Sequence, residues 1–402
     1  MGKPWDPSEP NSIECLQVVY KIAERCNINC SYCYYFNMGD DTALGRPARA
    51  SVGSTINLAK WIAAGCADLR IPRVNISFHG GEPMLAKPDR FAKMCEAFLT
   101  HIGPVAEVRF AIQTNGTIFN HDWLRVLVKY RVSIGISIDG DRADHDRFRL
   151  DHRGRSTFTV TENTIRTLVE ASAVFPSLRP STISVLDRHV DYAATFRYLR
   201  ALGIMQMHFL FPDRNANDHA PQVDKEAAEI GSGLLDLFTE WMIEDNPDIH
   251  VRFIDRALGY FRQGASPKPV PRRRKSNQVL VARSDETVAI DDSYIPALDW
   301  YAATPEFAIA DTNLRGVLAD PVFPAIETET SKLPDACTSC RWQDICHGGD
   351  LENRFSDQNG FNNPSVYCAA YKELYAGICN VLMNSGYPQS EIQRRFGDEH
   401  RV

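Results

Sequence analysis

Six short apolar runs recur along the first half of the chain, and each is separated from the next by a segment with helical periodicity. They are rich in β-branched and aromatic residues and nearly continuous in apolar character, which is typical of parallel strands buried on both faces. Repeated strand and helix units of this kind predict an α/β fold, with a parallel sheet curved into a partial or full barrel. The runs read LQVVYKIA from Leu16, VNISFH from Val74, VRFAIQT from Val108, VSIGISI from Val132, STISVL from Ser181 and MQMHFLF from Met205.

The pattern changes after Phe211. A polar, turn-rich stretch and one long helical segment lead to the basic sequence SPKPVPRRRK, which ends at Lys275. We interpret 212–275 as a connecting region and 276–395 as a smaller second domain. The basic run is interpreted as a solvated linker, with a nucleic-acid contact as the weaker alternative, because one short run in an acidic protein is little evidence for nucleic-acid binding.

The 402 residues carry a formal net charge of −7, which is unfavourable for a nucleic-acid-binding protein. The first twelve residues, MGKPWDPSEPNS, lack the apolar core of a signal peptide. No apolar run approaches the ~18 residues that a membrane-spanning helix needs. We therefore expect a cytoplasmic protein that binds neither membrane nor nucleic acid.

Eleven cysteines are unusual for such a protein, and they are unevenly placed. Three lie near residue 30 and four near residue 350, with none between Cys95 and Cys337. An odd number in a reducing compartment argues against a disulfide framework. Two tight groups predict two metal sites instead.

The first group is Cys26, Cys30 and Cys33, a C-x3-C-x2-C pattern directly after the first predicted strand. Three thiolates do not complete a tetrahedral zinc site without a fourth ligand. They can hold three irons of a [4Fe-4S] cluster and leave the fourth iron open for a ligand. A zinc site completed by a distant histidine, or free buried thiols, are the alternatives.

This pattern resembles the motif of the radical S-adenosylmethionine (SAM) superfamily, in which an aromatic residue precedes the last cysteine, as Tyr32 does here. The resemblance implies that SAM binds the open iron of a [4Fe-4S] cluster and that one-electron cleavage generates a 5′-deoxyadenosyl radical. It also implies SAM contacts at the ends of successive strands. These are His79 and the GGEP residues Gly80, Gly81, Glu82 and Pro83, then Asn115, Ser137 and Asp139, and finally Arg149, which suits a carboxylate. His79 has an equally good interpretation as a cap of its strand.

The second group is Cys337, Cys340, Cys346 and Cys368. Its spacing favours a four-cysteine zinc or iron–sulfur site over free thiols. It resembles the SPASM domain of peptide-modifying radical SAM enzymes, which implies that these four residues bind an auxiliary [4Fe-4S] cluster. Asp350 stands where that pattern has a further cysteine, and an upstream cysteine pair is also missing. We therefore expect one auxiliary cluster, and a partial (βα)6 barrel over 12–211 followed by a SPASM-like domain over 276–395.

Two stretches, HFLFPDRNAND and CHGGDLENRFSDQNGFNNPSVYC, resemble the maturases that crosslink ribosomally made peptides, including those that form cyclophanes. This implies that a hydrogen is taken from a residue β-carbon, which then bonds to an aromatic ring. A proton and an electron must then leave, for which a carboxylate and the auxiliary cluster are suited. The candidate bases are Asp213, Asp291, Asp292 and Asp299.

The expected partners are a precursor peptide and an electron donor, either a reductase or a flavodoxin or ferredoxin. Only 25 residues precede Cys26, so we expect no separate leader-binding domain. The barrel, the C-terminal region or a partner protein would then hold the peptide. The alternatives are formylglycine formation of the anaerobic sulfatase-maturating type, another β-carbon or thioether modification, and a non-enzymatic zinc-binding protein.

Overall fold

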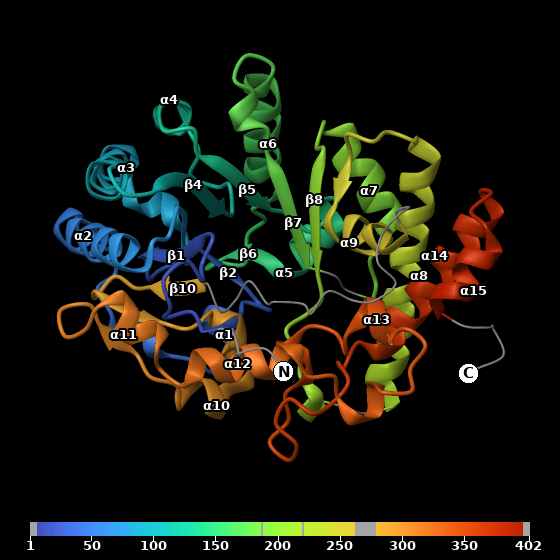
Figure 1. Cartoon of the computed structure of the whole chain (residues 1–402). Coiled ribbons are helices and arrows are strands. Elements are labelled where there is room, and N and C mark those ends of the chain that lie inside the picture. The colour runs from blue at the N-terminus through green and yellow to red at the C-terminus, as the bar shows by residue number, and fades with distance from the viewer. Residues whose placement is uncertain (1–5, 186–187, 219–220, 262–278, 397–402) are drawn as a thin grey trace. The chain divides into compact units, whose positions relative to one another are not determined.

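The computed structural model of the chain describes residues 6–185, 188–218, 221–261 and 279–396, which form two compact units (Figure 1). The first unit comprises described residues within 1–138, 145–182 and 274–328, and the second comprises those within 139–144, 183–273 and 329–402. The predicted basic linker SPKPVPRRRK lies outside the described residues. In the part of the chain that the structure covers, no helix is long and apolar enough to cross a membrane.

The first unit is built on a sheet in which five neighbouring strands run parallel, in the order β10, β1, β3, β4, β5. Two short strands continue it antiparallel beyond β10, and a separate two-stranded sheet pairs β2 with β6. The strands are β1 (Leu16–Ala23), β2 (Ile28–Cys30), β3 (Arg73–Gly80), β4 (Glu107–Thr114), β5 (Ser133–Ser137), β6 (Arg149–Asp151), β10 (Val279–Ala282), β11 (Thr287–Ala289) and β12 (Phe307–Ala308).

Helices join these strands and cover the sheet. The longest, α2, begins at a capping box in which the hydroxyls of Ser51 and Ser54 each accept a backbone N–H of the other residue. The helices are α1 (Tyr34–Asn37), α2 (Val52–Leu69), α3 (Pro88–Ile102), α4 (His121–Lys129), α6 (Phe158–Ser172), α10 (Leu298–Ala302) and α11 (Leu314–Leu318), with the short 3-10 helices η1 (Thr42–Gly45), η2 (Pro83–Ala86), η3 (Pro176–Leu178) and η6 (Asp292–Ala297).

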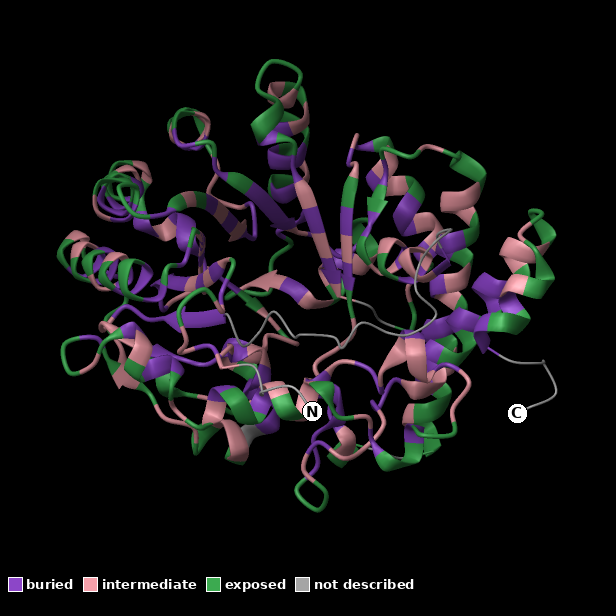
Figure 2. Ribbon diagram, in the orientation of Figure 1, coloured by how far each residue is buried: buried purple, intermediate pink, exposed green. Residues whose placement is uncertain are grey.

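An aromatic core holds this unit together. The ring of Phe78 on β3 lies 4.4 Å from that of Phe91 on α3, which in turn lies 5.2 Å from Trp123 on α4. All three are 0 or 1% exposed. Burying such side chains contributes roughly 1.5–3 kcal/mol each. The central strands carry mainly buried and intermediate residues, while the helices keep an exposed outer face (Figure 2).

The second unit packs helices around two strands. Gly231 of α8 lies against Ala370 of α14, and Gly377 of α14 lies against Leu235 of α8, so the two long helices approach closely. Its elements are α7 (Tyr192–Ala201), β8 (Gln206–Leu210), η4 (Ala216–Asp218), α8 (Pro221–Glu244), β9 (His250–Val251), α9 (Arg252–Phe261), η7 (Asp335–Cys337), α13 (Gln343–Cys346), η8 (Leu351–Arg354), α14 (Cys368–Asn384) and α15 (Gln389–Phe396). The elements α5 (Arg142–Phe148), β7 (Ser181–Val185) and α12 (Val322–Ser331) begin in one unit and end in the other.

The predicted α/β class is confirmed, and each of the six predicted strands is present, as β1, β3, β4, β5, β7 and β8. The strand β10 was not predicted, because four apolar residues are too short a signal to assign to a sheet. It pairs parallel with β1, so residues after 278 contribute to the first unit. The assignment of 12–211, 212–275 and 276–395 to separate functional domains stays a prediction.

Gly65 on α2 provides a test of the packing between α2 and α11. A Cβ atom at Gly65 would lie 2.4 Å from Cβ of Leu314, so we expect Gly65→Ala to lower the free energy of unfolding by about 1–3 kcal/mol. Thermal or urea unfolding of the full chain measures this change. Gly45→Ala is the matched control, because nothing lies within 4 Å of the new Cβ, and we expect a change within about 0.5 kcal/mol. Equal stability of the two variants would contradict the helix contact.

Candidate active site

The first cysteine group lies on the loop that follows β1. Cys30 is the last residue of β2, and Cys33 is the residue before α1. The β2–β6 pair places Cys30 opposite Arg149, so two residues more than a hundred positions apart in the sequence lie side by side here. Burial raises the pKa of the Cys26 thiol to about 12 and raises that of Cys33 as well. Metal binding would therefore have to deprotonate these thiols.

Two polar side chains are directed at the sulfur atoms. Asn115 Nδ2 lies 3.8 Å from Cys26 Sγ, and Arg149 Nη1 lies 3.8 Å from Cys30 Sγ. The Arg149 guanidinium also lies 5.4 Å from the centre of the Tyr32 ring. Hydrogen bonds from N–H groups to the sulfurs help to set the reduction potential of an iron–sulfur cluster, so these two donors suit a cluster.

The GGEP residues are held against the start of the cysteine loop. The backbone N–H of Gly81 donates to Ala23 O at 2.7 Å, and that of Glu82 donates to Arg25 O at 3.0 Å. A Cβ atom at Gly80 would lie 2.1 Å from Ala23 O, so the glycines are needed for this contact between strand ends. Whether they also approach SAM stays a prediction.

Glu82 is completely buried, and its carboxylate accepts three hydrogen bonds. The donors are the Met84 N–H, the Thr114 hydroxyl and the Asn115 N–H, at 2.7–2.9 Å. Burial nevertheless raises its pKa to about 7. The carboxylate therefore joins the ends of β3 and β4, and Pro83 begins η2 just beyond it.

Two further predicted SAM contacts, Ser137 and Asp139, lie in different units. Ser137 ends β5 in the first unit, where its hydroxyl accepts a hydrogen bond from Gln113 Nε2 at 2.9 Å. Asp139 belongs to the second unit, where its carboxylate accepts the Val185 N–H at 3.0 Å.

A buried charge cluster lies beside Cys33 and was not predicted. Lys21, near the end of β1, is 0% exposed and forms an ion pair with Asp292, which is 4% exposed. Its ammonium also lies 3.2 Å from His79 Nδ1 and 3.2 Å from the Tyr34 hydroxyl. Tyr34 in turn donates to Asp292 Oδ2 at 3.1 Å. His79 thus binds Lys21 from the end of β3, and its role as a SAM contact stays a prediction.

The electrostatics of this cluster favour an ionised Asp292 beside a neutral His79. Burial is the largest single influence on the pKa of Asp292 and would raise it, but Lys21, by its charge and its hydrogen bond, together with His79 and Arg283 outweighs burial, and the pKa lies below its ordinary value. The pKa of His79 falls to about 3, because protein surrounds the ring and the Lys21 ammonium lies beside it.

The other candidate bases have different environments. Asp291 is half-buried and accepts the Ser293 N–H at 3.1 Å, and Asp299 is exposed. Asp213 is half-buried in the second unit. Asp292 is therefore the candidate that the fold buries among charged and polar partners.

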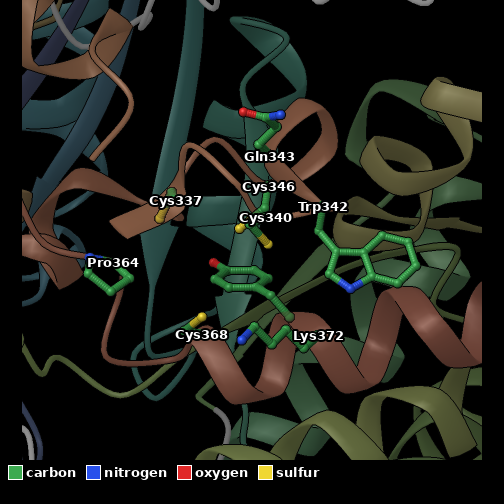
Figure 3. A pocket seen from close by; sticks show the side chains of 10 residues that line it. Cys337, Cys340, Trp342, Gln343, Cys346, Pro364, Cys368 and Lys372 are labelled. Atoms are coloured by element: carbon green, nitrogen blue, oxygen red, sulfur yellow. The ribbon is translucent and has the colours of Figure 1, made fainter. Parts of the chain in front are cut away.

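The second cysteine group lines one small cavity in the second unit (Figure 3). Cys337 ends η7, Cys346 ends α13 and Cys368 begins α14, so three helix ends and the turn at Cys340 supply the four sulfurs. Trp342, Tyr371 and Lys372 complete much of the wall. Burial raises the pKa of Cys346 to about 12.

Asp350 lies beside this cavity without being part of its wall. Its carboxylate is 3.3 Å from Arg256 Nη1 and 3.4 Å from the Tyr371 hydroxyl. A carboxylate paired with a guanidinium stands at the position where the SPASM pattern has a cysteine.

The two stretches that resemble peptide-crosslinking maturases meet in the second unit. Ala216 N donates to Phe355 O at 2.8 Å, and Asn353 Nδ2 donates to Arg214 O at 2.8 Å. The Tyr367 hydroxyl donates to Pro212 O at 2.7 Å, and its ring stacks on Phe211 with centroids 4.4 Å apart. Residues 211–217 and 353–367 thus form one structure next to the second cysteine group.

Both cysteine groups supply the thiolate ligands that iron–sulfur clusters use. Within the described residues, no three His, Cys, Asp or Glu side chains converge closely enough to hold one ion. Zinc requires four ligands around a single ion, whereas a [4Fe-4S] cluster spreads its ligands over separate irons. The three cysteines with Asn115 and Arg149, and the four-cysteine cavity, suit the wider arrangement.

Comparison with known proteins agrees with this reading. The sequence profile of the radical SAM superfamily matches residues 20–179. The serine-type anaerobic sulfatase-maturating enzyme of Klebsiella pneumoniae is 32% identical over 346 residues, covering 85% of this chain and 83% of that protein. The cysteine-type enzyme of Clostridium novyi is 22% identical, covering 89% and 93%.

Solved structures share the fold. The structure of anSMEcpe with bound AdoMet superposes with a TM-score of 0.74 at 21% identity, covering 92% of this chain and 98% of that chain. Streptococcus suis SuiB bound to its precursor peptide SuiA gives a TM-score of 0.52 at 14% identity, covering 90% and 76%.

The chain is therefore a radical SAM enzyme that modifies a peptide or protein, and its cofactors are SAM-binding and auxiliary [4Fe-4S] clusters. Within that superfamily it belongs to the family that includes the anaerobic sulfatase-maturating enzymes.

The cysteine assignments can be tested by counting iron. We expect about eight irons per chain in the anaerobically reconstituted protein, and a loss of about four in Cys30→Ala and of about four in Cys340→Ala. Cys30→Ala should also lose cleavage of SAM to 5′-deoxyadenosine, whereas Cys340→Ala should keep some. Cys15→Ala is the control, since Cys15 lies outside both groups. Normal iron content in either cluster variant would overturn that assignment.

Proposed function

We propose that this enzyme crosslinks a ribosomally made precursor peptide, joining an aromatic ring to a residue β-carbon to form a cyclophane. When bound, SAM and its cluster would provide the radical chemistry that removes one hydrogen atom from the β-carbon. The new C–C bond leaves the ring with one hydrogen too many, so one proton and one electron must leave. The product has two hydrogens fewer than the peptide.

Asp292 is the base that we assign to the proton. Both of its described hydrogen-bonding partners, Lys21 and Tyr34, bind Oδ2. No described residue donates to Oδ1, so that oxygen can accept a proton from a substrate. A buried carboxylate that is held ionised is suited to this role, because proton transfer needs the correct protonation state at the working pH.

The four-cysteine cavity is the site that we assign to the electron. A cluster bound by Cys337, Cys340, Cys346 and Cys368 can accept one electron and pass it to a redox protein. Cys340 is only half-buried, which leaves part of this site near the protein surface. The partners that this proposal requires are the precursor peptide and an electron donor for the SAM-binding cluster, such as a flavodoxin, a ferredoxin or a reductase.

The joined stretches 211–217 and 353–367 are the observation that favours crosslinking. Each resembles the corresponding stretch of the crosslinking maturases, and three hydrogen bonds and a ring stack join the two stretches. Asp350, in place of a cysteine, supports one auxiliary cluster rather than two.

Formylglycine formation is the second candidate. Two relatives that cover more than four fifths of this chain are named as cysteine-type and serine-type anaerobic sulfatase-maturating enzymes. Formylglycine formation, like crosslinking, is a two-electron oxidation at a β-carbon. Asp292 would then take the proton of a serine hydroxyl or a cysteine thiol.

Two peptide assays separate these candidates. The reconstituted enzyme is incubated with the Cp18Cys peptide, named in a structure of anSMEcpe, and separately with short precursor peptides encoded beside its gene. A crosslinked product has lost two hydrogens, resists fragmentation between the joined residues and does not react with hydrazines. A hydrazine-reactive aldehyde from Cp18Cys would instead establish formylglycine formation and overturn the crosslinking proposal.

Asp292→Asn tests the base. We expect product formation to fall about 10²- to 10⁴-fold while uncoupled SAM cleavage stays within a few-fold, because the amide does not accept the proton. The pKa of Asp292 lies below its ordinary value. Protonation of Asp292 should therefore lower the wild-type rate only below about pH 4. Asp299→Asn is the control, since Asp299 is exposed. Full product formation by Asp292→Asn would eliminate this assignment.

A further inference from the structure

We infer that Lys21 is the positioning residue of this site: its ammonium fixes the orientations of Asp292, His79 and Tyr34 and keeps Asp292 in the carboxylate form. This inference rests on the proposed function only for its catalytic consequence. The arrangement itself follows from contacts within the first unit.

The hydrogen-bonding capacity of Lys21 is completely used. An ammonium has three N–H donors and no acceptor. Its three partners are Asp292 Oδ2, His79 Nδ1 and the Tyr34 oxygen, which come from η6, β3 and α1. Because the ammonium can only donate, His79 Nδ1 must accept, so the ring proton is on Nε2. One side chain thereby sets the tautomer of His79 and the position of Asp292.

The charges around Asp292 explain why Lys21 is needed. The charged and titratable groups that face this carboxylate are Lys21 from β1, His79 from β3, Tyr34 and Tyr35 from α1, Arg283 from β10 and Tyr301 from α10. Of the two cations, Arg283 is engaged elsewhere, with Glu306 at 3.2 Å and the Tyr301 hydroxyl at 2.9 Å. Lys21 alone among these groups forms an ion pair with Asp292.

The charge balance of the wider cluster leads to the same conclusion. Two buried cations, Lys21 and Arg283, accompany two buried carboxylates, Glu24 and Asp292. Tyr35 lies between the pairs: it donates to Glu24, and its ring centre lies 4.4 Å from the Lys21 ammonium. Removing the Lys21 charge would leave a net negative charge in a dry site. A buried carboxylate without a partner takes up a proton rather than stay ionised.

The test uses infrared spectroscopy of the full-length reconstituted protein near pH 7.5. A buried protonated carboxylic acid gives a carbonyl stretch that a carboxylate lacks. We expect Lys21→Met to show a band that is missing from wild type, from Asp292→Asn and from the double variant Lys21→Met/Asp292→Asn. Subtracting the spectrum of the double variant from that of Lys21→Met cancels the absorption of the other carboxyl groups, Glu82 among them. No difference between Lys21→Met and the double variant would overturn the inference.

Lys129→Met is the matched control. On the surface, Lys129 pairs with Glu96 at 3.0 Å and lies 4.7 Å from the ring centre of Tyr130, so it has a similar set of partners without the burial. We expect no new band there. If Lys21→Met fails to fold or to bind iron, Lys21→Gln replaces it, since a neutral amide can still donate to Asp292 and His79.

Product assays then separate this inference from the proposed function. In Lys21→Met, or in Lys21→Gln if it replaces that variant, the pH at which the rate of product formation falls on the acid side of the pH–rate profile should rise by about one to three units. This is the range by which a nearby opposite charge shifts the pKa of a carboxyl group. Lys21→Arg, which keeps the charge, should restore the wild-type limb at least in part. If the carboxyl band appears but Asp292→Asn forms product normally, Lys21 holds the carboxylate as inferred and the assignment of Asp292 as base fails.

Discussion

The contact between the ends of β1 and β3 is the constraint on which the candidate site depends. Gly80 and Gly81 have no side chains, so the chain after β3 can lie directly on Ala23 and Arg25 and hydrogen-bond to their carbonyls. That contact fixes where the cysteine loop leaves the sheet. It also brings Glu82 to the end of β4, where the carboxylate binds the backbone of Asn115, whose side chain reaches Cys26. A side chain at either glycine would displace backbone atoms rather than a flexible neighbour, so this part of the fold and the position of the first cysteine group are determined together.

The same strand ends carry buried charges that cost free energy to bury and are retained. A buried ion pair is weak evidence for stability, since apolar residues of similar volume often do as well or better. Lys21, Asp292, Glu24 and Arg283 therefore need an explanation other than folding. Their contacts offer one: each charge is matched by an opposite charge or by hydroxyl groups, and the one carboxylate oxygen without a described donor, Asp292 Oδ1, belongs to the residue that chemistry requires. A charged site next to the cysteine loop is what the proposed reaction requires.

The sequence predicted the parts of this arrangement that depend on local pattern. Apolar runs with helices between them gave the six strands, and the spacing of Cys26, Cys30 and Cys33 pointed to the cluster. Asp292 was one of four candidate aspartates that the sequence did not distinguish. Only the fold separates them, because η6 brings Asp292 to Lys21 across 271 residues while Asp299, seven residues later, stays exposed. Lys21 was missed, although one available signal was a single lysine within the apolar run LQVVYKIA. The pairing of β10 with β1 was missed because it depends on contacts far apart in the sequence.

The proposed crosslinking oxidation must dispose of a proton and an electron, and the proposal assigns them to different chemistry. The proton requires an acceptor that touches the reacting atoms, and a buried carboxylate with one oxygen to which no described residue donates meets that need. The electron does not require contact, so its acceptor can be bound by a separate part of the chain, as the four-cysteine cavity is. This division also explains why Asp350 can stand in place of a cysteine: one cluster is sufficient to accept one electron. In this proposal the charge of Lys21 concerns only the proton, because it holds the carboxylate ready before a substrate arrives. The two tasks can therefore change independently, which is how relatives with a common fold can carry out different oxidations at a β-carbon.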